Sequence, residues 1–190
     1  MKKHHVMIDL ETLGTRPGCV ILEMAAVGFD ETGSEYEVYE SGIIELVSET
    51  AKGMHVDAET LKWWSDKTEF TSLLNGTRNF KLEVGNLIEF VGDVLADKGA
   101  VWCWGGSFDF PVLKHAIWSC GGAVPWEHWQ ERCARTLCNT LGVKRRGDTK
   151  HRALDDAMSQ IHAVQVALAE VGRMREMRAE GMKGVIFFLS

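Results

Sequence analysis

Asp9 and Glu11 stand two positions apart in residues 4–11, a segment in which the hydrophobic pattern alternates. This alternation predicts a β-strand, and in a strand residues i and i+2 lie on the same face. Two carboxylates this close to a buried sheet repel each other unless a cation lies between them. Carboxylate oxygens suit Mg²⁺ or Mn²⁺, so the pair predicts a divalent-metal site. A polar strand end that faces water would give the same pattern.

A third carboxylate, Asp109, follows two glycines at the end of a short apolar strand expected over residues 100–104. It would begin a helix over 109–120, where aspartate is also a common N-cap. In open α/β sheets functional groups gather where strands end, which is the place expected for Asp109. The residue therefore has two interpretations, a helix cap and a member of an active site.

His151 and Asp156 open a helix that the apolar spacing predicts over residues 152–171. A histidine can take the proton that a water attacking phosphorus must release. Asp155 falls on the solvent side of this helix, whereas Asp156 lies at the shoulder of its apolar stripe. The helical phase therefore favours Asp156 as the ligand. Taken alone, His151 would also suit a surface position ahead of a helix.

The elements that position these residues form an α/β pattern. Residues 4–11, 19–29 and 35–46 predict an antiparallel three-strand meander. Helices are then expected near 57–64, over 80–97 with a stop at Gly99, and over 109–120, 133–142 and 152–171, with the strand 100–104 between them. This order predicts a mixed sheet flanked by helices. We expect one domain over residues 1–171 and a C-terminal tail over 172–190, whose apolar end would suit an added strand, docking in a groove, or the pairing of two subunits into a homodimer.

Together the motifs resemble the DEDD superfamily of 3′-5′ exonucleases, of the DEDDh (DnaQ-like) type. The resemblance spans about residues 6–170, and residues 9–14 and 105–113 are similar to the family's first two motifs beyond the bare carboxylates. Residues 59–64 and 132–137 look like a small stand-alone branch that includes phage exonuclease A and bacterial exoribonuclease-like domains. Many family members have aspartate where this chain has Arg135, a departure that the branch tolerates.

The resemblance implies a ribonuclease H-like fold and a two-metal phosphodiesterase. Asp9 would bridge two Mg²⁺ or Mn²⁺ ions, with Glu11 and Asp156 completing one site and Asp109 holding the other. His151 would be the general base. The implied activity is release of nucleoside 5′-monophosphates from the 3′ end of single-stranded DNA or RNA, and no residue decides between the two.

Several residues near these motifs are candidates for holding a strand with a free single-stranded 3′ end. The backbone after the metal pair would approach the terminal nucleotide, aromatic side chains would stack on bases, and an arginine would meet a phosphate. The candidates are Thr12, Leu13, Gly14, Trp63, Trp64, Phe108 and Arg135. Large aromatics are more often core, and Arg135 would equally suit an exposed helix. The basic residues 144–152 are either a strand guide or a solvated loop.

The composition excludes some alternatives. The 190 residues carry 21 basic and 27 acidic side chains, a formal net charge of −6, which argues against coating of nucleic acid by phosphate neutralisation. Two divalent ions would cancel the negative charge of the four carboxylates themselves at the place where a phosphate must come. Five cysteines without a Cys-x-x-Cys pair predict reduced thiols in a cytoplasmic protein, and no apolar run is long enough for a membrane span. His4 and His5 are expected on the surface of the first strand, or as a fragment of a metal site.

Two rival functions stay open at this point. The first is a catalytically silent module on the same fold that binds nucleic acid or protein. The presence of all five expected residues argues against it, because a silent module would be free to lose them. The second is a phosphodiesterase acting on dinucleotides, against which the aromatic residues and the basic segment favour a longer strand.

Overall fold

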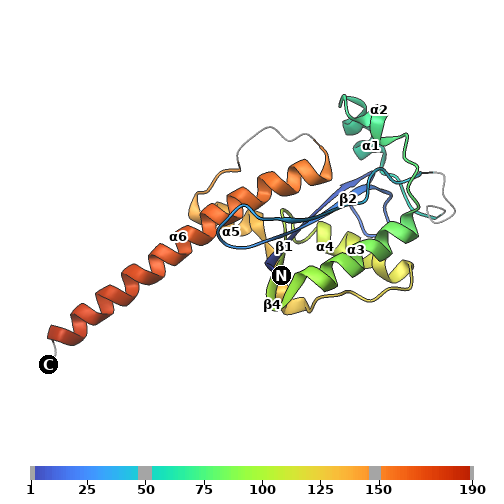
Figure 1. The fold of residues 1–190 in the computed structure, drawn as a ribbon. Coiled ribbons are helices and arrows are strands. Elements are labelled where there is room, and N and C mark those ends of the chain that lie inside the picture. The colour runs from blue at the N-terminus through green and yellow to red at the C-terminus, as the bar shows by residue number, and fades with distance from the viewer. Residues whose placement is uncertain (1–2, 47–52, 146–150, 189–190) are drawn as a thin grey trace.

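The computed structural model describes residues 3–46, 53–145 and 151–188, the last eight of them without side-chain detail. Its centre is a five-stranded sheet of order β3-β2-β1-β4-β5 (Figure 1). β1 pairs antiparallel with β2 and β2 with β3, whereas β1 with β4 and β4 with β5 are parallel. The strands are β1 (Lys3–Thr12), β2 (Ile21–Phe29), β3 (Glu37–Glu40), β4 (Leu95–Cys103) and β5 (Glu131–Cys133). The predicted mixed sheet, a meander plus parallel strands, is confirmed.

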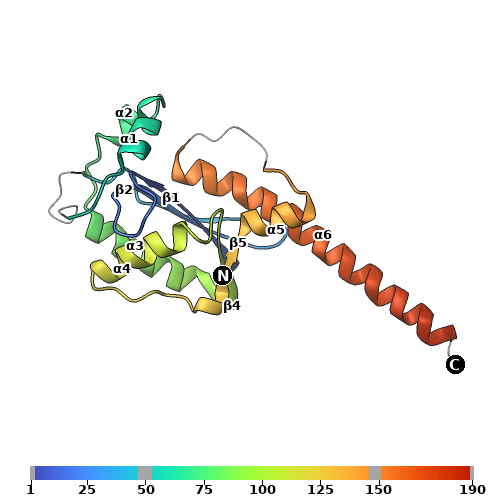
Figure 2. The same ribbon diagram turned by 180° about the vertical axis from the view of Figure 1, so that it is seen from behind.

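Helices cover both faces of this sheet. α3 and α4 pack on one face and α5 and α6 on the other, while α1 and α2 lie beside the end of β1 (Figures 1 and 2). The helices are α1 (Ala58–Ser65), α2 (Phe70–Leu73), α3 (Phe80–Val94), α4 (Asp109–Ser119), α5 (Ala134–Leu141) and α6 (Ala153–Phe188), with a 3₁₀ turn at His128–Gln130. This arrangement buries β1 on both of its faces.

The two faces of β1 belong to different cores. Val6, Ile8 and Leu10 pack against α3 and α4. Met7 lies on the opposite face, in a core shared with α5 and α6. Side chains alternate along a strand, so a carboxylate two or four positions after Met7 must point toward α6. The strand therefore aims its acidic pair at the helix that carries the third motif.

Several elements differ from the prediction: β4 begins at Leu95 instead of residue 100, and α2 and β5 were not predicted. The third strand is only Glu37–Glu40, and α3 ends at Val94 rather than at residue 97. Leu95 has an extended backbone and pairs with Lys3, so strand pairing replaces the last helical turn. Gly99 lies inside β4, where a Cβ would come within 2.8 Å of the His4 carbonyl oxygen. The glycine therefore permits a close approach between strands instead of stopping a helix.

His5 is not a surface residue, and that prediction was wrong. Its side chain is buried, and its Nδ1 accepts a hydrogen bond of 3.2 Å from the Trp102 indole Nε1. The imidazole also lies against Phe29, with ring centroids 5.1 Å apart. An indole N–H only donates, so Nδ1 of His5 is the acceptor here, and burial lowers the pKa of this imidazole. His4 is exposed, as expected.

The C-terminal tail is helical through Phe188. α6 has 36 residues, begins over the sheet and extends well beyond the body of the molecule (Figures 1 and 2). On its projecting part Met174 and Met177 are exposed. One of the three placements expected for the tail was an added strand. That prediction was wrong for the residues up to 188, because they are helical. Within the part of the chain that the structure describes, no helix combines the length and apolarity of a membrane span.

Candidate active site

Asp9 and Glu11 lie on the face of β1 that is covered by α6, and both are more than nine-tenths buried. Asp9 Oδ1 accepts a hydrogen bond of 2.5 Å from the Gln160 amide nitrogen, which comes from α6. Glu11 pairs across the ladder with Glu23 of β2. The strand pattern thus places both carboxylates together, as expected, in the space between sheet and helix.

Asp109 lines the same space from the start of α4, beside the loop that follows β4. It is the first residue of α4, and the N-cap position belongs to Phe108, so Asp109 is not the cap. Its carboxylate is buried and accepts a hydrogen bond of 3.1 Å from the Gly105 amide in the loop after β4. The loop thereby holds Asp109 at a strand end, the position that the functional interpretation predicts.

The third motif completes the group. One donor atom each of Glu11, His151 and Asp156 lies within 4.8 Å of the others. Asp156 is buried and faces the site, whereas the neighbouring Asp155 is exposed. This is the arrangement that the helical phase predicted. Asp156 Oδ1 also lies 2.8 Å from the Arg145 guanidinium. The imidazole of His151 stands edge-on to Trp63, with ring centroids 4.8 Å apart.

A cavity of about 650 Å³ joins all five expected residues. A second cavity of about 400 Å³ lies beside it, and the two share five lining residues. The shared residues are Leu10, Glu11, Thr15, Trp63 and Phe108. The two cavities therefore form one continuous hollow that runs from the carboxylates past the exposed ring of Trp63.

The carboxylates crowd negative charge into a buried place. Burial, followed by the charges of Asp109 and Glu11, raises the pKa of Asp9 well above its ordinary value. Burial and the charge of Asp156 raise the pKa of Glu11 to about 8, and burial raises the pKa of Asp109 to about 6. A divalent cation would relieve this repulsion, and buried oxygen donors are the ligands that Mg²⁺ and Mn²⁺ prefer. The donor set therefore fits the implied metals.

The structure separates the two adjacent tryptophans. Trp63 is 44% exposed and lines both cavities. Trp64 is 1% exposed, packs on Phe70, and donates an indole hydrogen bond of 2.8 Å to the Thr12 carbonyl. Trp64 also lines the second cavity, but as a buried core side chain that forms part of its wall, whereas the ring of Trp63 is open to solvent.

The other substrate candidates divide in the same way. Phe108 lines both cavities, Arg135 lines the first, and Thr12 and Gly14 line the second. Leu13 lines neither: its side chain is buried in a core cluster and its amide donates 2.9 Å to the Val20 carbonyl. Of the basic segment 144–152, residues 146–150 lie outside the described residues.

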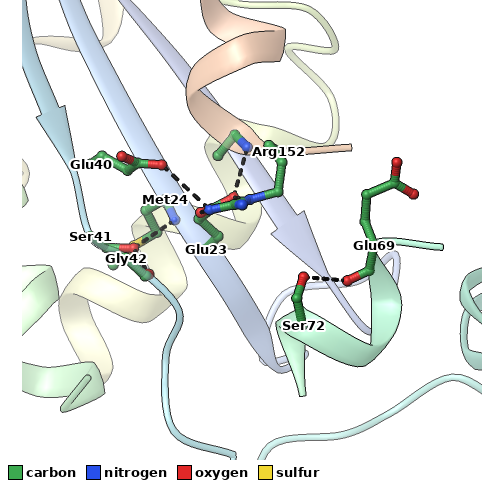
Figure 3. A network of polar contacts seen from close by, with 9 residues as sticks. Glu23, Met24, Glu40, Ser41, Gly42, Glu69, Ser72 and Arg152 are labelled. Carbon is green, nitrogen blue, oxygen red and sulfur yellow. Dashed lines mark hydrogen bonds and ion pairs between the residues drawn. The ribbon is translucent and has the colours of Figure 1, made fainter. Parts of the chain in front are cut away.

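Two residues of this region were missed by sequence reasoning: Gln160, which lines the cavity, and Glu23, which lies beside Glu11 on β2. The second is the more unusual. It is fully buried on β2 and binds Arg152, the residue after His151 (Figure 3). Arg152 also comes within 3.6 Å of Glu40 on β3. A lone carboxylate in the apolar segment 19–29 is a signal that a buried partner must exist, but it does not say which.

The mixed sheet and the gathered carboxylates have the arrangement expected of the ribonuclease H-like 3′-5′ exonucleases of the DEDDh type. Within it, the sequence matches the 3′-5′ exoribonuclease Rv2179c-like domain over residues 4–168, and the chain belongs to that family. The exodeoxyribonuclease of Enterobacteria phage T4 is 25% identical over 130 residues, which cover 58% of this chain and 54% of the phage protein. The chain thus spans about half the length of that curated relative.

Solved structures share the fold at low sequence identity. E. coli exonuclease I in complex with a 5cy-dT13 oligonucleotide superposes with a TM-score of 0.63 at 12% identity, over 93% of this chain and 43% of that one. The nuclease domain of 3′hExo, a DEDDh family member bound to rAMP, gives 0.59 at 10% identity, over 87% and 92%. S. pombe Pop2p with Mg²⁺ and Mn²⁺ gives 0.57 at 14%, over 86% and 82%. These likenesses support the fold, and the family match identifies a 3′-5′ exonuclease domain.

Proposed function

We propose that this domain removes nucleotides one at a time from the 3′ end of a single-stranded nucleic acid and releases nucleoside 5′-monophosphates. The observation that carries the proposal is the convergence of Asp9, Glu11, Asp109, His151 and Asp156 on one cavity. Three separate segments of the chain supply them. Each of the five side chains is buried or half-buried and carries an oxygen or nitrogen donor suited to phosphodiester hydrolysis.

The four carboxylates would hold two Mg²⁺ or Mn²⁺ ions. Asp9 would contribute to both sites, Glu11 and Asp156 would complete one, and Asp109 would hold the other. When bound, two such ions stabilise both the attacking and the leaving oxygen of the phosphodiester. Support comes from the raised pKa values of Asp9 and Glu11, because carboxylates that resist ionisation alone gain most from a cation.

His151 is the proposed general base. A donor atom of its imidazole lies within 4.8 Å of Glu11 and Asp156, close enough for a water between them to be deprotonated at a ring nitrogen. The rings of Trp63 and Trp64, with centroids 4.8 and 5.9 Å from that of the imidazole, limit where the imidazole can move. A positioned base of this kind typically contributes about 10²–10⁴ in rate.

Single-stranded RNA is the proposed substrate class. The matching family is described as an exoribonuclease, and this match covers more of the chain than the likeness to the phage exodeoxyribonuclease. The exposed ring of Trp63 and the side chain of Phe108 provide stacking surfaces for unpaired bases beside the carboxylates. Arg135 and Arg145 line the same cavity and supply guanidinium groups for phosphates.

The test compares RNA and DNA strands of one sequence, each labelled at the 5′ end, with Mg²⁺ or Mn²⁺. We expect a ladder that shortens one nucleotide at a time from the 3′ end, with RNA cleaved faster. The same strand carrying a 3′-terminal phosphate serves as the control for end recognition. Binding without cleavage in both metals would establish a silent module, and cleavage of dinucleotides alone would establish the dinucleotide phosphodiesterase.

A further inference from the structure

Glu23 is a fully buried carboxylate that the proposed chemistry does not use. It lies on β2 directly across the ladder from Glu11. Its charge there adds to the repulsion that already raises the pKa of Glu11. A buried ion pair is often no more stabilising than well-packed apolar residues of similar volume. Fold stability alone therefore does not explain a carboxylate at this position.

Two hydrogen-bond donors of Glu23, the Arg152 guanidinium and the Ala153 amide, lie at the start of α6. The Arg152 guanidinium donates through Nε to both carboxylate oxygens, at 3.2 and 3.1 Å, and through Nη2 to Oε1 at 2.6 Å (Figure 3). Glu23 Oε2 also accepts 2.9 Å from the amide of Ala153, the first residue of the helix. An arginine fork and a helix N–H on one carboxylate fix orientation as well as distance. Glu23 therefore fastens the first turn of α6 to the centre of the sheet.

The two residues of the third motif flank Arg152 in the sequence: His151 comes directly before it and Asp156 comes four positions after it. His151 has a backbone φ of +50°, a left-handed conformation that residues other than glycine rarely adopt. The Asp156 amide donates 2.9 Å to the Arg152 carbonyl, which continues the turn to the expected metal ligand. With Arg152 held on one side and the ring of Trp63 on the other, the strained His151 has little freedom to leave the cavity.

We propose that Glu23 and Arg152 are positioning residues, which hold His151 in the conformation that directs its imidazole at the attacking water. This inference rests on the proposed function, since it assigns a part in that reaction. Neither side chain lines the catalytic cavity, so both act through the turn and not on the substrate. Partners of this kind typically change activity by about 10–100-fold when removed.

The first test uses Glu23→Gln and Arg152→Lys, with Glu40→Gln as the matched control. Glu40 approaches the same Nη2 of Arg152, at 3.6 Å, but from the exposed β3. We expect Glu23→Gln and Arg152→Lys to lower kcat about 10–100-fold with KM within about twofold of wild type. Glu40→Gln should retain wild-type kcat. An unchanged kcat in a folded Arg152→Lys variant would overturn the proposal.

The second test separates positioning from general stability by a double-mutant cycle with His151→Ala. If Glu23 acts through His151, then Glu23→Gln should cost less than about twofold in kcat once His151 is absent. Losses that multiply would overturn the inference, because a structural role remains whether or not His151 is present. Arg152→Lys in the same background decides the question if Glu23→Gln does not fold. Failure of the proposed function is a different result, namely no cleavage by the wild-type chain.

Discussion

The Arg145 guanidinium lies 2.8 Å from the Asp156 carboxylate, through Nη2 and Oδ1. The same side chain contacts the Ser159 hydroxyl and lies over the ring of Trp104, 5.7 Å from its centroid. Arg145 is thus held by three groups while it fixes one oxygen of a proposed metal ligand. Of the lysines and arginines that the structure describes in the basic segment 144–152, Arg145 is the one that lines the cavity.

Replacing Arg145 with methionine should weaken metal binding. Without its partner the Asp156 carboxylate is free to rotate, and loss of an outer-shell partner typically costs about 10–100-fold in metal affinity or activity. Calorimetric titration with Mn²⁺ checks this without substrate. Arg173→Met is the matched control, since Arg173 pairs with Glu170 on the exposed part of α6. Tighter Mn²⁺ binding by the Arg145 variant would show instead that the arginine competes with the metal.

Trp63→Ala should impair strand binding without impairing the fold. Trp63 is half-exposed and lines both cavities, and a stacked base contributes about 1–3 kcal/mol. We expect KM for a single strand to rise about tenfold. Trp129→Ala controls for loss of an exposed tryptophan, because Trp129 is 49% exposed and lines neither cavity. Equal KM values for the two variants would remove Trp63 from the binding site.

Trp64→Ala should instead destabilise the protein. This side chain is buried, and its loss would also leave the Thr12 carbonyl without its indole donor. Truncation of a buried aromatic side chain costs about 3–5 kcal/mol. Denaturant unfolding of the two variants side by side checks the contrast. A wild-type free energy of unfolding for Trp64→Ala would contradict its placement in the core.

The metal-free protein should lose stability as the pH rises from about 7 to about 8. The pKa of Glu11 is about 8 in the fold, far above its ordinary 4.5, so the folded state holds a proton that the unfolded state has released. The unfolded state binds fewer protons in this range, and the free energy of unfolding therefore falls with pH. Thermal unfolding with and without Mg²⁺ measures it. Mg²⁺ should stabilise more at about pH 8, where binding displaces fewer protons.

Glu11→Gln is the companion experiment. Because it removes a charge that burial disfavours, the variant should unfold at a higher temperature than the metal-free wild type at about pH 8, while losing activity. Its unfolding temperature should also depend less on pH. A lower unfolding temperature for Glu11→Gln would mean that the carboxylate is already compensated without a metal.

Local periodicity predicted the parts of the site that depend on one element. Strand alternation placed Asp9 and Glu11 on one face, and helical phase distinguished Asp156 from Asp155, because both follow from backbone geometry alone. The boundary at Leu95 was missed, since its pairing with Lys3 comes from a strand distant in sequence.

Longer-range relationships were beyond the sequence for the same reason. Glu23 and Arg152 are 129 positions apart, and the sequence states only that each needs a partner. Trp63 and Trp64 differ by one position on an eight-residue helix, so their roles depend on where that helix docks. Burial of His5 likewise depends on Trp102 of the neighbouring β4. Tertiary packing decides these cases, and a single sequence does not encode it in a readable pattern.

The most direct test of the site compares Asp156→Asn with Asp155→Asn in release of nucleoside 5′-monophosphates from a single-stranded RNA with Mg²⁺. The two residues are adjacent in α6, but only Asp156 faces the cavity. We predict that Asp156→Asn lowers the rate of release by more than about 100-fold, which exceeds the loss expected when a residue only supports a metal ligand. Asp155→Asn should keep nearly full activity. Equal activity of the two variants, or greater loss from Asp155→Asn, would contradict the assignment of this cavity as the catalytic centre.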